Sequence, residues 1–252
     1  MRRTLLIVFA AIVLLGVAAA VLAPATLFAP RVERATGGAL VLRGVEGTVW
    51  RGRGVLDASG AQLPFGWTLS AAPLLRGELQ ALVASFDAQG TLPRATITAT
   101  REKVQLRNVE ATLPANLITN AVPNMQKLGL TANGEIALAS PRLDWTPATF
   151  DGDVRAVWRM ATLALPPLPP LDLGELTATL VADGKRLAGP VTNQGGDLDI
   201  RGDVSLGADR SAAVTLTLTP RRSDNTALSR LLSSIGTPVG NGWRISWQTP
   251  GR

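Results

Sequence analysis

The sequence predicts a mainly β protein, with a single N-terminal transmembrane helix followed by an antiparallel β-sheet domain and one or two short helices. Two observations carry this prediction: an uncharged, largely apolar run stands at the N-terminus, and polar and apolar residues alternate along most of the remaining chain. Turn residues separate the alternating segments at intervals of about 8–12 residues, which is typical of antiparallel strands with one buried face.

The N-terminal run covers residues 5–23 (LLIVFAAIVLLGVAAAVLA) and follows Arg2 and Arg3. A helix of this length spans roughly 28 Å, close to the hydrocarbon thickness of a bilayer, about 30 Å. The two arginines favour a cytoplasmic N-terminus, which puts the rest of the chain across the membrane. We expect the anchor to contact lipid through Leu5, Ile7, Phe9, Ile12, Leu15 and Val21.

A cleaved signal peptide is the alternative interpretation of this run, because residues 18–20 are three alanines that suit a cleavage site. The run is longer than the usual apolar region of about 7–15 residues, which favours the uncleaved anchor. Both interpretations export the body. The predicted organisation is a cytoplasmic stub and anchor over 1–23, a linker over 24–35, and a periplasmic β domain over 36–252.

Period-two alternation marks the strands of the body, at 95–100, 104–107, 135–138, 175–181, 197–206 and 211–219. Asn133-Gly134 and Asp183-Gly184 are predicted to be tight hairpin turns. Two stretches, 66–81 and 144–156, share the order Trp-Thr, short connection, Gly, new strand. This near-repeat suggests two similar halves, 36–125 and 126–252, although two amphipathic hairpins can also agree by chance.

One segment has helical periodicity instead. Its apolar residues recur at i, i+3, i+4 and i+7, which predicts a helix over 225–235. Asp224 or Thr226 suits its N-terminal cap, and Gly236 stands where a C-terminal glycine is expected. The residues of the apolar stripe are Leu228, Leu231, Leu232 and Ile235.

Composition argues against an enzyme. The 252 residues include no His and no Cys, which removes thiol nucleophiles, imidazole metal ligands and the commonest general base. No Ser-x-x-Lys or Gly-x-Ser-x-Gly motif occurs. We therefore expect no cofactor and no metal; the aspartates at 151, 153, 197, 199 and 203 lack a surrounding Ca²⁺-binding loop. The net charge of +6 on an exported chain does not favour nucleic acid as a partner.

The densest local motif is LRGVEGTVWRGRG, residues 42–54. Its glycines interrupt an apolar segment, which predicts a bulged strand centred on residues 48–50 and lying beside a neighbour. Arg51 and Arg53 alternate, so they share one side of that strand. Lipid head groups, an acidic partner and water alone all remain open as what they meet.

Four motifs follow one another along the chain, at residues 47–52, 67–77, 152–161 and 231–242. In this order they resemble the type II secretion system protein N family (general secretion pathway protein N). The resemblance covers nearly the whole chain, with one departure: Trp243 follows the last glycines, and the chain has no Tyr. The family-like positions, which are also the candidate interaction residues, are Gly47, Thr48, Val49, Trp50, Gly52, Trp67, Gly77, Gly152, Trp158 and Gly236.

This resemblance implies a non-catalytic inner-membrane subunit of a type II protein secretion system, which helps export folded proteins from the periplasm across the outer membrane by protein–protein docking. It implies a single-pass protein with a cytoplasmic N-terminus and a periplasmic body. Its partners would be other inner-membrane secretion subunits, with the secretin as a further candidate. The alternation also resembles AsmA-like periplasmic lipid-handling proteins; that alternative requires a continuous concave strip of uncovered apolar side chains.

Overall fold

The computed structural model describes residues 22–27, 29–35, 40–58, 61–85, 94–116, 129–164, 166, 169–209, 211–222, 226–249 and 251. The predicted membrane anchor, including its six lipid-contacting residues, lies outside these ranges except at its last two positions. In the ranges given, none of the helices has the length and apolar character that crossing a bilayer requires.

The chain divides into two compact units, unit 1 (residues 1–92) and unit 2 (residues 93–252). In unit 1, four strands form an antiparallel sheet in sequence order, so the predicted β architecture is confirmed there. The stretch predicted as a linker holds two of the short helices. The elements are η1 (Ala25–Leu27), α2 (Ala29–Ala35), β1 (Leu40–Gly47), β2 (Arg51–Ala58), β3 (Ala61–Ser70), α3 (Ala71–Leu74) and β4 (Leu79–Ser85).

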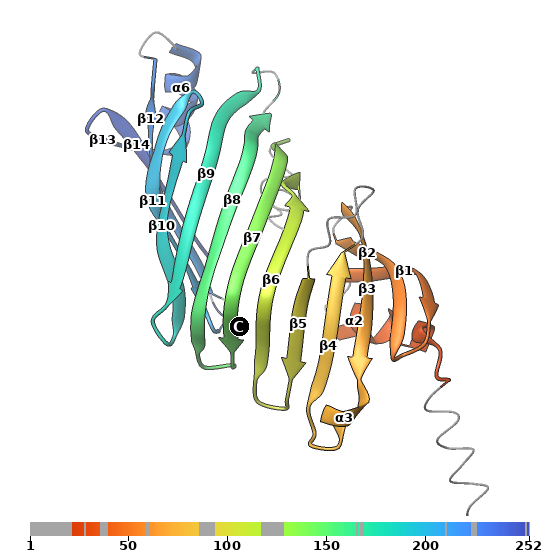
Figure 1. The fold of residues 1–252 in the computed structure, drawn as a ribbon. Helices are drawn as coiled ribbons and strands as arrows, with labels where there is room; N and C mark the ends of the chain where they lie inside the picture. The colour runs from red at the N-terminus through yellow and green to blue at the C-terminus, as the bar shows by residue number, and fades with distance from the viewer. Residues whose placement is uncertain are drawn as a thin grey trace, which may run out of the picture. The chain divides into compact units, whose positions relative to one another are not determined.

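Unit 2 is a longer antiparallel sheet in which the strands from β5 to β12 follow one another in sequence order, and β14 then pairs with β12 (Figure 1). The predicted similarity of halves 36–125 and 126–252 stays a prediction. The elements are β5 (Arg94–Ala99), β6 (Val104–Pro114), β7 (Thr131–Trp145), β8 (Phe150–Ala164), β9 (Leu171–Ala182), β10 (Arg186–Gln194), β11 (Leu198–Gly207), β12 (Ala212–Pro220), α6 (Thr226–Ile235), β13 (Thr237–Val239) and β14 (Gly242–Thr249).

Strand registers gather apolar side chains on one face of the unit 2 sheet, here called the apolar face. Each residue in the row pairs with the next across two strands, is two positions from it on one strand, or is two positions from the residue that pairs with it, so all share one side of the pleat. The row consists of Leu106, Leu143, Val154, Leu180, Leu187, Leu206, Val204, Val214 and Trp247.

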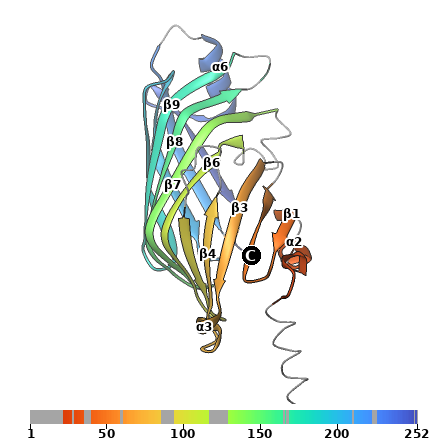
Figure 2. The ribbon, with the colours of Figure 1, turned by 45° about the vertical axis from the view of Figure 1, so that its right-hand side comes forward.

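The predicted helix is confirmed as α6, and it covers one end of the apolar face. Leu228 and Leu232 are buried, whereas Ile235 is 55% exposed, so the last position of the predicted stripe does not pack. This ten-residue helix packs in one core with side chains of β8, β9, β11, β12 and β14. Figure 2 shows the strands of unit 2 curving, with α6 at one end of them. The partners of α6 in this core are Trp158, Ala161, Leu163, Leu171, Leu173, Leu176, Leu198, Ile200, Leu216, Leu218 and Trp243.

A buried asparagine links three strands beside this core. The Asn193 amide nitrogen donates to the carbonyls of Leu173 (2.8 Å) and Leu198 (2.9 Å), and its oxygen accepts from the Ile200 N–H (2.8 Å). Asn193 lies on β10, and its three partners lie on β9 and β11. Both the nitrogen and the oxygen of the Asn193 amide therefore have hydrogen-bond partners inside the sheet, which makes this polar side chain compatible with burial.

The two predicted hairpin dipeptides have different structures. Asp183-Gly184 is a tight turn between β9 and β10: the Asp183 N–H donates to the Arg186 carbonyl at 2.9 Å, as predicted. Asn133-Gly134 instead lies inside β7 as a bulge, so that prediction is wrong. Gly134 has φ +102°, and the Asn133 carbonyl accepts a hydrogen bond from the Trp158 indole at 2.9 Å, which fixes the bulge.

Candidate functional site

The glycine-rich motif forms the hairpin between β1 and β2. The Thr48 N–H donates to the Arg51 carbonyl (2.8 Å), and the Thr48 hydroxyl accepts from the Arg51 N–H (3.2 Å). The predicted bulge is confirmed, because the register shifts between Arg43 and Glu46. The prediction that a strand is centred on residues 48–50 is wrong: Gly47 takes φ +93°, and the side chain of Thr48 closes a turn at that point.

This turn is held from both sides by hydrogen bonds to other segments of unit 1. The Trp67 indole donates to the Val49 carbonyl (3.0 Å), and the Leu69 N–H donates to the Trp50 carbonyl (2.7 Å). On the other side, the Val49 N–H donates to the Ala23 carbonyl (2.9 Å). The last residue of the predicted anchor is thus hydrogen-bonded to the motif.

Gly52 explains why the motif needs a glycine beside this tryptophan. Gly52 pairs with Trp67 across β2 and β3, and a Cβ added at Gly52 would overlap the indole ring and approach the Glu46 carbonyl at 2.7 Å. The ring lies where a side chain would otherwise stand. The motif and the more distant Trp67 therefore form one packed corner of unit 1. The motif residues in this corner are Gly47, Thr48, Val49, Trp50 and Gly52.

An open groove of about 460 Å³ lies over this corner. Arg51 and Arg53 lie on it together, as their alternation predicts, with Leu82 46% exposed on β4. Arg53 pairs with Glu46 at 2.7 Å, whereas the Arg51 guanidinium has no acidic partner in the part of the chain that the structure describes. The groove is lined by Glu46, Gly47, Arg51, Gly52, Arg53, Gly66, Trp67, Thr68, Leu82 and Ala84.

The other sequence-predicted positions do not line this groove. Gly77 lies in the connection from α3 to β4 with φ +75°. In unit 2, Gly152 lies beside the register shift between β7 and β8, and Trp158 packs in the core beneath α6. The Gly236 N–H donates to the Leu232 carbonyl at 2.9 Å, ending α6. These four positions support local turns, bulges and packing.

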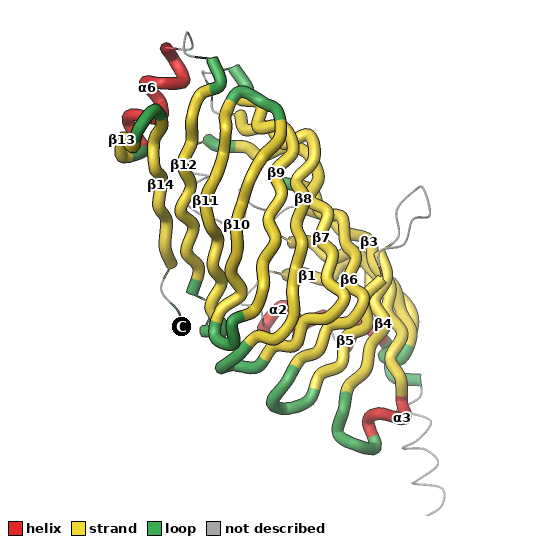
Figure 3. Tube along the Cα trace, turned by 60° about the vertical axis from the view of Figure 1, so that its left-hand side comes forward, coloured by secondary structure: helices red, strands yellow, loops and turns green. Residues whose placement is uncertain are grey.

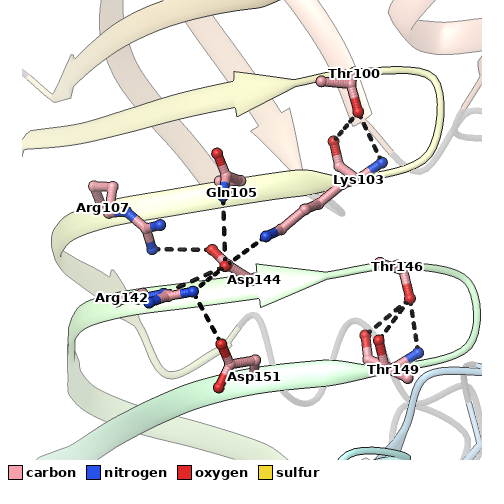
Figure 4. Close-up of polar contacts among 9 residues, drawn as sticks. All are labelled: Thr100, Lys103, Gln105, Arg107, Arg142, Asp144, Thr146, Thr149 and Asp151. Carbon is pink, nitrogen blue, oxygen red and sulfur yellow. Dashed lines mark hydrogen bonds and ion pairs between the residues drawn. The ribbon is translucent and has the colours of Figure 1, made fainter.

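Sequence reasoning missed the densest charged cluster, which crosses β6, β7 and β8 on the polar face of unit 2 (Figure 4). Asp144 is 3% exposed at its centre. Its carboxylate contacts Lys103 at 2.8 Å, Arg107 at 2.9 Å and Arg142 at 2.7 Å, and Arg142 also reaches Asp151 at 3.0 Å. Only the register of three strands brings these residues together, so no local sequence signal could have found them.

Asp144 has a structural role in this cluster. Burial raises the pKa of its carboxyl group, but the hydrogen bonds from Lys103 and Arg142 outweigh burial and hold that pKa well below its usual range. The hydrogen bond to Asp144 in turn raises the pKa of Arg142. Asp144 is therefore a permanently charged brace between strands, unsuited to proton transfer near neutral pH.

Two of the other acidic positions considered in the sequence, Asp197 and Asp199, are also engaged in local contacts. Asp199 pairs with Arg201 at 3.2 Å and with Arg221 at 3.6 Å. The Asp197 carboxylate accepts from the Asp172 N–H at 3.0 Å. Over the described ranges, no group of three or more His, Cys, Asp or Glu residues is placed to hold a metal ion.

Comparison with known proteins identifies the family. No curated protein and no solved structure matches this chain. The matching family model is the one described as type II secretion system (T2SS), protein N, and it extends over residues 38–246, a range that holds the groove, the curved sheet and α6. Because this match spans most of the sequence, the chain belongs to the type II secretion system protein N family and is a component of that protein-transport machinery.

Proposed function

We propose that this secretion component is not an enzyme and acts by docking, with the groove of unit 1 as its docking surface. The observation that carries the proposal is a hairpin that is fixed by hydrogen bonds and exposes two arginines: Arg53 is paired with Glu46, whereas Arg51 has no acidic partner among the described residues. The turn is fixed by hydrogen bonds to two separate segments, β3 and Ala23, so the surface is formed before any partner binds. Preformed surfaces lose little entropy on binding, which favours recognition.

The chemistry of the groove favours an acidic segment with an apolar residue. Arg51 offers a guanidinium that can bind a carboxylate through two N–H groups. Leu82 and Ala84, from β4, supply apolar surface next to it. An extended acidic stretch of another inner-membrane secretion subunit is the occupant that we propose, and the secretin is a less direct candidate.

A location close to the inner membrane supports this choice of partner. The hydrogen bond from the Val49 N–H to the Ala23 carbonyl connects the hairpin to the last residue of the predicted anchor. If residues 5–23 span the bilayer with a cytoplasmic N-terminus, the groove lies beside the periplasmic surface of that membrane. The proposed localisation is thus the inner membrane, with one span and a periplasmic body.

The experiment compares Arg51→Glu with Arg155→Glu, an exposed arginine on β8 of unit 2, in the full-length chain and its native host. We expect Arg51→Glu to reduce co-purification of identified inner-membrane secretion subunits at least tenfold and to lower the amount of secreted protein in the medium. Arg155→Glu should behave as the unmodified chain does. Equal co-purification by all three proteins would contradict the groove as the docking surface.

The apolar face of unit 2 favours lipid handling as a second candidate function. Its row from Leu106 to Trp247 lies outside the group of side chains that α6 covers. The test is lipid mass spectrometry on the purified full-length protein, comparing Val214→Asp with Thr215→Asp, neighbours on opposite faces of β12. Lipid bound to the unmodified chain and to Thr215→Asp, but lost from Val214→Asp, would support this function. Absence of lipid from all three would reject it.

A further inference from the structure

The last strand of unit 2 has an open edge. β14 pairs with β12 from Trp243 to Thr249, but on its other side β13 covers only Gly242–Arg244. Figure 3 shows β14 as the last strand on its side of the sheet, with β13 and α6 beside one end of it. Over Ile245–Thr249, β14 therefore has no second neighbour among the described strands.

This edge lacks the features that normally prevent pairing with another chain. Protected edges carry bulges, charged side chains or proline. The edge strand of unit 1, β1, has both a bulge and charges, at Arg43 and Glu46. The open stretch of β14 (ISWQT) has no charge, proline or register shift, and Trp247 is 39% exposed on it.

Backbone alternation shows which groups are available at this edge. β13 and β14 are joined by a two-residue loop, Gly240-Asn241, so Val239 and Gly242 form a hydrogen-bonded pair. Every second residue from Gly242 then directs its N–H and C=O toward the β13 side. Ser246 and Gln248 thus present unpaired backbone donors and acceptors along the open stretch.

We propose that two copies of this chain pair through this stretch, antiparallel, with the two-fold axis at Trp247. The open stretch is symmetric about that residue, and any register shifted toward Arg244 would collide with β13 of the partner. In the proposed register, Ser246 of one copy exchanges both backbone bonds with Gln248 of the other, and no like charges face each other. The two Trp247 side chains meet as a non-hydrogen-bonded pair, the closer kind of cross-strand contact.

A second copy fits this edge better than an unrelated strand, because apolar and polar residues alternate symmetrically along the open stretch. Ile245, Trp247 and Thr249 lie on the apolar face, and Ser246 and Gln248 lie on the polar face. Antiparallel pairing about Trp247 puts apolar residues opposite apolar ones and polar residues opposite polar ones. The apolar faces of the two copies become continuous. A stretch this short buries less than a standard interface, so we expect weak, concentration-dependent association.

The natural absence of cysteine makes the test direct, because a single introduced thiol can only link two copies. The full-length Trp247→Cys variant is purified, oxidised and analysed without reducing agent, beside Asp203→Cys, an exposed residue on β11, which is paired on both sides. We expect disulfide-linked dimer to form at least tenfold faster at position 247. Equal rates at the two positions would overturn the proposal.

A second variant shows whether the link depends on strand pairing. Ser246→Pro removes an N–H from the open edge, where proline is tolerated, and leaves the bonds to β12 in place. Added to Trp247→Cys, it should reduce the rate of cross-linking to that of Asp203→Cys while circular dichroism stays unchanged. Unchanged fast cross-linking would show that the copies meet by another surface and would overturn the proposed pairing.

Discussion

Deleting the amide of Asn193 tests how the core of unit 2 is held. Asn193→Ala leaves the Ile200 N–H and the Leu173 carbonyl without this partner, at residues that are almost wholly buried. The Leu198 carbonyl keeps its hydrogen bond from Arg221 at 3.0 Å. Two buried orphan groups at about 1–3 kcal/mol each predict a loss of roughly 4 kcal/mol in the free energy of unfolding.

The measurement is urea or thermal unfolding of the full-length protein, followed by circular dichroism. At about 2–4 °C per kcal/mol for a unit of this size, the expected fall in Tm is roughly 10 °C. Asn241→Ala, in the exposed turn between β13 and β14, is the matched control and should change little. If the two variants differed by less than about 1 kcal/mol, the asparagine would not be the strand link inferred from its hydrogen bonds.

Three further perturbations follow from the packing and charges. Gly52→Ala should cost about 1–3 kcal/mol through overlap with the Trp67 ring, seen as a lower Tm and altered tryptophan fluorescence; an unchanged Tm would refute that contact. Leu232→Ala should cost about 2–5 kcal/mol, against under about 1 kcal/mol for the exposed Ile235→Ala, in urea unfolding; equal losses would contradict burial of α6. The folded-state pKa of Asp144 is depressed, so its contribution to stability is present above the unfolded pKa, about 3.9, and is lost as pH falls below it. Asp144→Asn should therefore flatten the acid limb of a stability–pH profile below about pH 5, and an unaltered limb would show that another group is responsible.

The sequence predicted elements that depend on local pattern and missed those that depend on register. Alternation located the strands, and the stripe at 228–235 located α6. Asn133-Gly134 and Asp183-Gly184 carry the same local turn signal, yet only the second forms a hairpin. The difference arises from the Trp158 indole, which lies 25 positions from Asn133 and accommodates the first dipeptide inside a strand.

The candidate site shows the same limit. The motif around Thr48 was recognised, and its bulge was predicted, but its turn was placed inside a strand. The turn depends on Gly47, on the Thr48 hydroxyl and on the distant Trp67. The brace at Asp144 could not be inferred at all, because the cations around it come from β6, from the turn before β6 and from β7, and no single segment specifies how these align.

The order of the strands has a consequence for how the molecule is assembled. From β5 to β12, each strand bonds to the one just made, so the sheet can extend step by step as the chain is synthesised, with little loop entropy to overcome at each step. The final step differs, because β13 is made before β14 but lies outside it, so β14 must insert between β12 and β13, and α6 lies between β12 and β13 in sequence. Truncation within about the last thirty residues would therefore leave the strands from β5 to β12 paired but without α6 and β14, so the apolar core of unit 2 would be exposed to water.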